Sequence, residues 1–486
     1  MQNSSLKILF VVSEMAPFAK TGGVGEFAGT LPFEIASQGW DVRIVLPKYK
    51  QISGDYTQCM EYICDYPVNL DWRKQTAIIR KVDFDNGTGN IPCYFIDNAY
   101  YFDRQQMYSN PDDAERFAFF CKAVLEMLPK INFVPDIIHC NDWETGPVCV
   151  LLRQQYKYID FYKQIKTVFT IHNLQCQGNF PKDTLSLLNL GEEFYHPDSL
   201  EFYGNVNYMK AGIIYSDLIT TVSPTYAKEI QTPEYGNGLD GIIRKRQADL
   251  FGIINGINYN VYNPQTDPYI YEKYDSNSLE KKYVNKIKFQ QELGLEQNPE
   301  IPLIAMISYL TDEKGFDLIE ESIEEIMQMN IQFVILGTGD PVYEDLICSI
   351  QQKYPSKMRA IIAYNMELAQ KIFAASDIYL MPSKFEACGL NQMIALRYGS
   401  VPVVRATGGL ADTVIPFDIQ NCDGNGFIFK EHCRQSMLFT LKTAVELYKT
   451  YPAAWKQMVS KGMQLDFSWN ASALQYIKLY YKLTEK

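Results

Sequence analysis

Residues 381–416 of the chain read MPSKFEACGLNQMIALRYGSVPVVRATGGLADTVIP. The apolar run that leads into them, Asp377–Met381, is typical of a buried parallel strand. A turn with a single acid, Glu386, and a loop of small residues, Ala387–Gly389, then lead to an amphipathic segment, 391–398. A strand, a loop and a helix start in this order are how α/β proteins present backbone N–H groups to a phosphate.

The second half of this stretch repeats the arrangement. An apolar run, Val401–Val404, predicts another buried strand, and Gly408 and Gly409 open another helix after it. Two helix starts suited to phosphate therefore flank one carboxylate, that of Glu386. Each feature alone has an ordinary explanation, such as a strand-to-helix turn at Gly389 or a solvated cap at Glu386. Together they indicate a sugar held by its diphosphate, with the acid beside the sugar.

Strands and helices alternate along the chain, the pattern of parallel sheets with helices on both faces. A polar, proline-bearing segment, 263–268, separates two such series. We expect two Rossmann-like, doubly wound domains, 1–264 and 265–465, and a C-terminal helix within 466–486 that packs back on the first domain. Ligands of such sheets bind at the carboxyl ends of the strands, and we expect the site in a cleft between the domains. The strands predicted from apolar runs are 7–12, 42–45, 137–139, 167–171, 218–222, 303–307, 332–336, 359–362, 378–381 and 401–404.

Length and composition are those of an ordinary globular protein with more than one domain. The chain has 486 residues, of which 47% are hydrophobic and 21% charged. Its net charge of −12 argues against nucleic acid or an anionic membrane as a partner, but not against a neutral polymer. The 11 cysteines include no CxxC pair, which favours free thiols in a reducing cytoplasm. The four histidines lack metal-ligand spacing, and we find no signal peptide or 18-residue apolar span, so we expect a cytoplasmic protein without a zinc site.

A second glycine motif, Lys20–Glu26, follows the first predicted strand and opens a helix. Its glycines, at 22, 23 and 25, do not match the dinucleotide fingerprint, and its lysine precedes them, unlike the lysine of a Walker loop. Adjacent glycines let the backbone approach an anion closely, and Lys20 adds a positive charge. The alternative explanation is a plain strand-to-helix turn with a surface lysine.

These motifs closely resemble those of bacterial glycogen synthases and plant starch synthases. That family typically has PSRFEPCGLTQL…ALRYGTLPVVRRTGGLADTV where this chain has residues 382–414, and KTGGLGD where it has Lys20–Glu26. Residues 170–178, 97–120 and 255–264 resemble the further elements TIHNLAYQG, IDNPEYFDR…YGDPDDAERFAFF and NGID…WNP. The resemblance therefore covers nearly the whole chain.

The resemblance implies a GT-B glycosyltransferase, metal-independent and without a cofactor, whose partners are ADP-glucose and an α-1,4-glucan. The implied reaction moves glucose from ADP-glucose to the non-reducing end of the glucan with retention of configuration, by double displacement or front-face attack. By position, Glu386 and His172 hold the glucose, Lys314 binds the diphosphate and Asp142 lies near the acceptor. The other implied donor-binding residues, with Tyr364 stacking on adenine, are Lys20, Gly22, Gly23, Glu26, Asn173, Tyr309, Tyr364, Cys388, Gly389, Leu390, Asn391, Gly408 and Gly409.

The chain departs from the family pattern at several positions. Where the family has SRLTxQKG, residues 308–315 read SYLTDEKG, so Tyr309 replaces an arginine of the diphosphate clamp while Lys314 is kept. A phenol carries no charge, and a charge-assisted hydrogen bond is about twice as strong as a neutral one. Three alternatives therefore stay open: an ADP-glucose-dependent synthase, a UDP-glucose-dependent transferase of the same fold, and a weakly active glucan- or nucleotide-binding protein. The other departures are Glu26 for Asp, Asn141 and Glu144 in the usual HDWH, Lys384 for Arg, Ala387 for Pro and Asn391 for Thr.

One motif resembles a metal site. Asp83-Phe84-Asp85 is a DxD, which binds a divalent ion in some glycosyltransferases. It runs directly into Asn86-Gly87, a strong signal for a hairpin turn. We therefore expect its two carboxylates on an edge strand and not at a metal ion.

Overall fold

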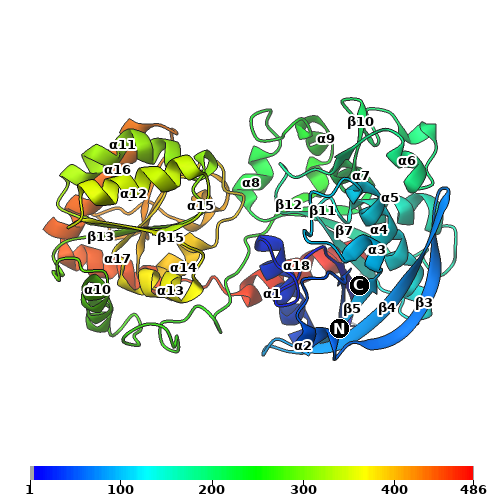
Figure 1. Cartoon of the computed structure of the whole chain (residues 1–486), viewed down its shortest axis with the longest axis horizontal. Helices are drawn as coiled ribbons and strands as arrows, with labels where there is room; N and C mark the ends of the chain where they lie inside the picture. Colours follow the sequence, from blue (N-terminus) through cyan, green and yellow to red (C-terminus); the bar gives the residue numbers. More distant parts are fainter. Residues whose placement is uncertain (1–4, 485–486) are drawn as a thin grey trace. The chain divides into compact units, whose positions relative to one another are not determined.

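The computed structural model describes residues 5–484, which form two compact units (Figure 1). One unit contains the residues up to Ile253 and those from Trp469 on, and the other is Ile254–Ser468. Each unit is built on a mainly parallel sheet with helices on both faces, which confirms the predicted fold class.

The boundary between the units lies after Ile253 and not after residue 264. The N–H of Ile253 donates to the carbonyl of Thr221 at 2.8 Å, so this residue still belongs to the first sheet. The N–H of Tyr274 donates to the carbonyl of Pro264 at 3.1 Å, which ties the proline-bearing segment to the second unit. The polar composition of residues 263–268 therefore does not mark the boundary. The backbone hydrogen bonds show that the second unit already includes this segment.

The main sheet of the first unit has, among the described residues, nine strands in the order β12-β11-β7-β6-β1-β2-β5-β4-β3. Pairing is parallel from β12 to β5, so the carboxyl ends of these strands share one edge, and β4 and β3 join as antiparallel strands. A separate three-stranded antiparallel sheet, in the order β8-β10-β9, is formed by the chain between β7 and β11. The strands are β1 (Lys7–Val11), β2 (Asp41–Pro47), β3 (Glu61–Leu70), β4 (Arg73–Asp85), β5 (Asn90–Asp97), β6 (Ile137–Asn141), β7 (Lys166–Ile171), β8 (Asn179–Phe180), β9 (Glu201–Phe202), β10 (Asn205–Asn207), β11 (Leu218–Thr221) and β12 (Leu250–Gly252).

Helices of the first unit include the last helix of the chain, α18. The ring centres of Trp469 on α18 and Phe27 on α1 are 5.8 Å apart, and Tyr480 OH lies 2.7 Å from His139 Nδ1. The chain therefore returns to its first unit after completing the second. The helices are α1 (Gly23–Ser37), α2 (Gly54–Thr57), α3 (Ala99–Phe102), α4 (Asp113–Lys130), α5 (Gly146–Leu151), the π-helix η1 (Leu152–Tyr156), α6 (Thr184–Leu187), η2 (Glu192–Phe194), α7 (Tyr208–Tyr215), α8 (Pro224–Glu229), α9 (Asp240–Lys245), η3 (Gln247–Asp249) and α18 (Trp469–Thr484).

The second unit has a parallel sheet in the order β15-β14-β13-β16-β17-β18. Its inner strands β14, β13, β16 and β17 are apolar and largely buried, with α11, α12 and α16 on one side of the sheet and α13, α14 and α17 on the other (Figure 1). The predicted strands 303–307 and 378–381 are confirmed at both ends. The elements are α10 (Glu280–Glu292), β13 (Leu303–Ile307), η4 (Asp312–Lys314), α11 (Phe316–Gln328), β14 (Gln332–Gly337), α12 (Pro341–Lys353), β15 (Met358–Ile362), α13 (Met366–Ala375), β16 (Ile378–Met381), α14 (Asn391–Arg397), β17 (Val401–Arg405), α15 (Gly408–Thr413), β18 (Phe427–Phe429), α16 (Arg434–Thr450) and α17 (Pro452–Gln464).

The DxD motif lies on β4, which is an inner strand of the sheet. Its residues 83–85 nevertheless pair with β5 alone, because β3 begins only opposite Lys81. Asp83 accepts a hydrogen bond from Lys81 Nζ at 2.9 Å, and Asp85 accepts one from the N–H of Gly87 at 2.7 Å. Both carboxylates are therefore used locally, by a neighbouring side chain and by the turn.

Candidate active site

Lys314 and Glu386, the two charged residues predicted for the site in the second unit, are in direct contact. Lys314 Nζ lies 2.8 Å from Glu386 Oε2, and Ser383 Oγ donates to the same oxygen at 3.4 Å. Lys314 ends η4 after strand β13, and Glu386 follows the neighbouring strand β16. The two side chains therefore meet at the carboxyl edge of the sheet, where ligands of such folds bind.

The backbone around the pair leaves no room for a side chain at Gly315. This residue has φ +83°, and a Cβ atom there would lie 2.4 Å from the carbonyl oxygen of Pro382. The N–H of Lys384 also donates to the carbonyl of Glu313 at 2.8 Å. The turn that carries the lysine is thus pressed against the loop that carries the glutamate, and this contact sets the distance between their charges.

The environment keeps the lysine charged. Burial lowers the pKa of Lys314, but the carboxylate of Glu386 more than offsets this and raises the pKa overall. Burial also raises the pKa of the neighbouring Glu313. The loop therefore presents a cation and an anion in contact, both partly shielded from water, where charges act strongly on a bound ligand.

Gly408 and Gly409 allow the Glu386 loop to pack on the start of α15. Gly408 has φ +42°, and a Cβ atom would lie 1.9 Å from the carbonyl oxygen of Glu386. A Cβ atom at Gly409 would lie 2.0 Å from that of Cys388. The N–H of Gly409 donates to the carbonyl of Ala387 at 3.1 Å. Gly409 therefore has a packing role in the structure, and its donation to phosphate stays a prediction.

The loop between Cys388 and Asn391 is held by its own hydrogen bonds. Gln392 Nε2 donates to the carbonyls of Cys388 and Gly389 at 3.1 and 3.0 Å, and Gly389 has φ +69°. Leu390 precedes α14, and Asn391 Nδ2 donates to the carbonyl of Ile307 at 2.9 Å. Asn391 therefore ties this loop to the end of β13, which is the start of the Tyr309 loop. Burial raises the pKa of the Cys388 thiol to about 12, so the thiol is protonated at neutral pH.

Two tyrosines of the predicted donor site are exposed. Tyr309 follows β13 and is 60% exposed, and Tyr364 follows β15 and is 76% exposed. Both loops leave the carboxyl edge of the second sheet, on either side of the end of β14. Their rings are available to a ligand at this edge, as the roles predicted from position require.

In the first unit, Asp142 and His172 lie together at the ends of the adjacent strands β6 and β7. The N–H of His172 donates to Asp142 Oδ1 at 2.8 Å, and His172 Nε2 lies 3.0 Å from Asn141 Oδ1. Asn141 Nδ2 donates to the carbonyls of Val11 and His139, at 3.2 and 3.3 Å. Asn141 Oδ1 is thus the acceptor, and His172 carries its proton on Nε2. Burial lowers the pKa of His172 to about 3, so the ring is neutral.

Asp142 occupies an unusual backbone conformation. Its φ is +55°, in the left-handed region, and such strain concentrates at functional positions. Burial raises the pKa of Asp142 to about 7, although the backbone N–H groups of His172 and Asn173 act in the opposite direction. Asn173 Oδ1 accepts the N–H of Gln175 at 3.0 Å, which shapes the turn after β7.

The glycine loop after β1 is organised by Glu14, a buried acid that the sequence motifs do not single out. Its carboxylate accepts the N–H groups of Thr21 at 2.6 Å and Gly22 at 3.1 Å, the hydroxyl of Thr21, and Tyr108 OH at 2.9 Å. Tyr108 belongs to the tyrosine-rich segment 97–120. Glu14 therefore holds the glycine loop and this segment together, a link that only the fold creates.

Lys20 and Glu26 form an ion pair across the glycine loop. The stem of Lys20 crosses the start of α1 over Gly25, where a Cβ atom would lie 2.8 Å from Lys20 Cγ. Within the described residues, no atom lies within 4 Å of a Cβ built at Gly22 or Gly23. The N–H of Gly22 is used by Glu14 at 3.1 Å, so Gly23 is the position of this pair that suits close approach of an anion.

Comparison with known proteins agrees with this geometry. Residues 7–245 match the starch synthase catalytic domain, and residues 286–456 match the glycosyl transferases group 1 domain. The chain is 48% identical to glycogen synthase from Desulforudis audaxviator over 99% of this chain and 97% of the relative, and 48% identical to that from Moorella thermoacetica over 100% and 98%. The chain belongs to the glycogen and starch synthase family. It is therefore a glycosyltransferase that builds a glucan.

Solved structures of this family and fold give the same result. The catalytic domain of starch synthase IV from Arabidopsis thaliana, bound to ADP and acarbose, superimposes with a TM-score of 0.90 at 34% identity, covering 99% of this chain and 100% of that chain. Sucrose-phosphate synthase from Thermosynechococcus elongatus shares the fold, with a TM-score of 0.60 at 17% identity over 99% of both chains. These matches confirm the predicted GT-B architecture and the family resemblance.

Within residues 5–484, no group of three or more His, Cys, Asp or Glu side chains is arranged to hold a metal ion. None of the helices in the described part of the chain has both the length and the apolar character needed to span a bilayer.

Glu144, one of the departures from the family pattern, is a buried acid whose surroundings disfavour its charge. Burial, followed by the charge of Asp142, raises the pKa of Glu144 well above its usual value. The unfolded chain releases this proton near pH 4.5, whereas the folded chain keeps it to higher pH, so the unfolding free energy falls as pH rises, by up to about 1.4 kcal/mol per pH unit. Glu144→Gln removes this titration. We expect the variant to gain stability over the natural protein between pH 5 and pH 8.

The measurement is urea unfolding of both proteins at these two pH values, with the exposed Glu193→Gln as a matched control. The control should have the same unfolding free energy as the natural protein at both pH values. A stability difference between Glu144→Gln and the natural protein that does not change with pH would show that Glu144 is ionised in the folded state.

Proposed function

We propose that this protein is a retaining glucosyltransferase that moves glucose from ADP-glucose to the non-reducing end of an α-1,4-glucan. The observation that carries the proposal is the contact between Lys314 and Glu386 at 2.8 Å, at the carboxyl edge of a sheet in a glycogen synthase relative. A lysine beside a carboxylate suits a nucleotide sugar, because the cation meets the diphosphate and the anion meets the sugar hydroxyls. Neither group needs a metal ion for these roles.

The proposed roles follow from where charge develops. As the glycosidic bond to the diphosphate breaks, negative charge grows on the leaving phosphate oxygen, and Lys314 and Lys20 stabilise it. In the structure each lysine forms an ion pair with an acid, Lys20 with Glu26 and Lys314 with Glu386. These acids hold the ammonium groups in place until phosphate competes for them, so the cations need little reorganisation when the donor binds.

Positioning of the glucose is assigned to the carboxylate of Glu386 and to His172. His172 is neutral, with its Nε2 proton on Asn141, so it acts through hydrogen bonding and not through charge. Asp142 is assigned to the acceptor side, where its pKa of about 7 lets it exchange a proton with a sugar hydroxyl near neutral pH. Gly23 offers open backbone beside Lys20, whereas Gly22 shapes the loop through its N–H on Glu14.

The donor base is assigned as adenine. Support comes from the starch synthase IV relative, whose structure holds ADP, and from the exposed ring of Tyr364 on the second unit. UDP-glucose is the alternative donor. The test is nucleotide release from ADP-glucose and from UDP-glucose with glycogen as acceptor, run with a chelator to remove divalent ions. Release of ADP at an undiminished rate supports the proposal, and release of UDP alone or dependence on added metal contradicts it.

Tyr309 favours a second candidate, a glucan-binding protein with weak turnover. The residue stands at the family's arginine position and is 60% exposed. An active enzyme with Tyr309 would bind the diphosphate without the cation that the family arginine supplies. Tyr309→Arg should then raise the transfer rate several-fold, roughly the gain expected when a charged bond replaces a neutral one.

The measurement is steady-state transfer from ADP-glucose to glycogen, with ADP affinity measured alongside. Tyr309→Leu serves as the control, because it removes the hydroxyl without adding charge and should not gain rate. An unchanged rate together with unchanged ADP affinity for Tyr309→Arg would place residue 309 away from the phosphates.

A further inference from the structure

The hairpin of β3 and β4 extends beyond the sheet on the side of the candidate site. The last residue pair between β4 and β5 is Ile78 with Asp97, at the carboxyl end of β5, whereas the hairpin closes at Leu70 with Arg73. Residues 73–77 therefore continue past that end, by about 17 Å at the rise of an antiparallel strand. β5 runs parallel to β6 and β7, so the hairpin tip lies on the edge that carries Asp142 and His172.

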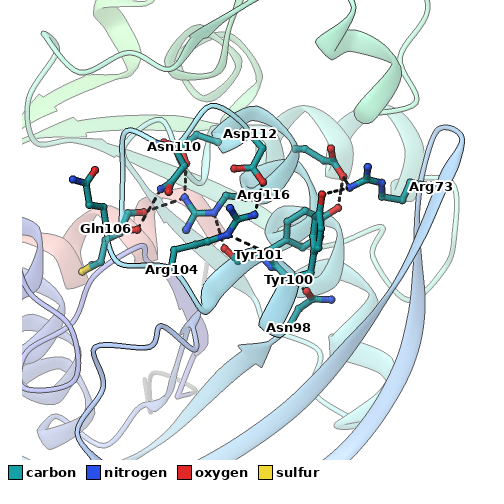
Figure 2. Close-up of polar contacts among 12 residues, drawn as sticks. Arg73, Asn98, Tyr100, Tyr101, Arg104, Gln106, Asn110, Asp112 and Arg116 are labelled. Atoms are coloured by element: carbon teal, nitrogen blue, oxygen red, sulfur yellow. Dashed lines mark hydrogen bonds and ion pairs between the residues drawn. The ribbon is translucent and has the colours of Figure 1, made fainter.

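The tip of this hairpin carries an exposed aromatic side chain. Trp72 occupies the two-residue turn and is 73% exposed, and Tyr100 on α3 is 51% exposed. The guanidinium carbon of Arg73 lies 4.4 Å from the ring centre of Trp72 and 5.1 Å from that of Tyr100. A single arginine thus joins two outward-facing rings from separate elements. Figure 2 shows Arg73 and Tyr100 in contact.

Charge pairing holds this arrangement without leaving a net charge. Arg73 Nη1 lies 2.8 Å from Glu115 Oε1 and donates to Tyr100 OH at 2.9 Å. Arg104 Nη2 lies 2.8 Å from Asp112 Oδ2, and its Nε donates to the carbonyl of Tyr100 at 3.1 Å (Figure 2). Each guanidinium has its own carboxylate. The charge of both guanidinium groups is therefore balanced where they contact the Tyr100 residue, and their N–H groups and the paired carboxylates border the rings.

We propose that Trp72 and Tyr100 form an aromatic platform that binds a neutral polysaccharide chain apart from the transfer residues. The C–H faces of a sugar ring pack on an aromatic ring, and its hydroxyls bond to guanidinium and carboxylate groups at the ring edges. A nucleotide or another anion is disfavoured because both cations are already neutralised. The identification of the chain as an α-1,4-glucan rests on the proposed function.

The placement suits an acceptor that is a long polymer. β5 lies three strands from β6 in the sheet, roughly 14 Å at the usual strand spacing. When one chain of a branched glucan such as glycogen is held on the platform, the other chains of the same molecule stay near the transfer residues, and their effective concentration there rises. A short maltooligosaccharide cannot occupy both places. The platform therefore raises the affinity for glycogen without changing the transfer step.

The test compares Trp72→Ala/Tyr100→Ala with the natural protein, with Trp72→Ala alone as a second variant that keeps the contacts of Tyr100. The matched control is Tyr158→Ala, which removes a ring that is 77% exposed and also has a lysine 4.9 Å from its centre. We expect the half-saturating glycogen concentration to rise roughly tenfold in the double variant, with the maximal rate unchanged. The kinetics with maltotriose should not change. In a native gel that contains glycogen, the double variant should migrate faster than the natural protein and the control.

Equal retardation of the double variant and the natural protein by glycogen would overturn the proposal. So would a loss of maltotriose transfer in Trp72→Ala, because it would place the rings in the transfer site. Failure of the proposed function would look different: the natural protein would transfer no glucose to any acceptor, while glycogen would still retard it more than the double variant.

Discussion

Glu386→Ala should lower the turnover of glucosyl transfer by about a thousandfold while the protein stays folded. The variant loses the carboxylate assigned to the sugar and releases Lys314 from its partner at 2.8 Å. Removal of one group that stabilises the transition state typically costs 10²–10³ in turnover, equivalent to about 3–4 kcal/mol. Because the lysine stays, ADP binding should fall far less than turnover does.

The measurement is the rate of ADP release at saturating ADP-glucose and glycogen, with the affinity for ADP measured by calorimetry. Glu320→Ala, at an exposed position of the same unit, is the control and should keep its full rate. Near-natural turnover in Glu386→Ala would remove this residue from the site. An equal loss of turnover and of ADP affinity would assign it to binding of the nucleotide instead.

Gly315→Ala should abolish most of the activity through the backbone, without touching a ligand. The residue has φ +83°, and the added Cβ would lie 2.4 Å from the carbonyl oxygen of Pro382. Left-handed backbone costs an alanine about 1–2 kcal/mol, and the overlap must in addition push the lysine turn away from the Glu386 loop. A shift of about 1 Å between catalytic groups can cost roughly a hundredfold in rate.

Gly294→Ala is the matched control for this prediction. Gly294 also has positive φ, +62°, but the nearest atom to its Cβ is the end of the Arg359 side chain at 3.7 Å. Both variants carry the cost of left-handed backbone, and Gly315→Ala should lose further stability from its overlap with Pro382, as measured by thermal unfolding. Only Gly315→Ala should lose transfer activity. Equal activity of the two variants would show that the contact between the turn and the loop does not position the pair.

The strands and the phosphate-type loops could be predicted from the sequence because their signals are local. Short apolar runs such as 303–307 and 378–381 are buried on both faces, and length and composition suffice to find them. The glycines of the loops also stand out, although their reasons differ: Gly409 packs against the Glu386 loop and uses its N–H there. The sequence motif predicts that a glycine is needed at such a position. It does not predict whether a ligand or another segment of the protein packs against that glycine.

Contacts between distant segments could not be predicted. Glu14 binds Tyr108, which lies 94 residues away in the chain, and nothing near Glu14 in the sequence indicates this partner. The hairpin of β3 and β4 was also missed, because its strands alternate exposed and buried residues and carry many charges. Such strands have a weaker apolar signal than the buried parallel ones. The unit boundary at Ile253 likewise depends on a tertiary hydrogen bond.

We propose above that the protein adds glucose from ADP-glucose to the non-reducing ends of an α-1,4-glucan. The most direct test supplies ADP-glucose labelled in its glucose to the pure protein with glycogen, followed by digestion of the polymer with β-amylase, which removes maltose from α-1,4-linked non-reducing ends. We expect label in the polymer and its early release as maltose, and no incorporation by Glu386→Ala. Absence of label in the polymer, or label that resists β-amylase, would contradict it.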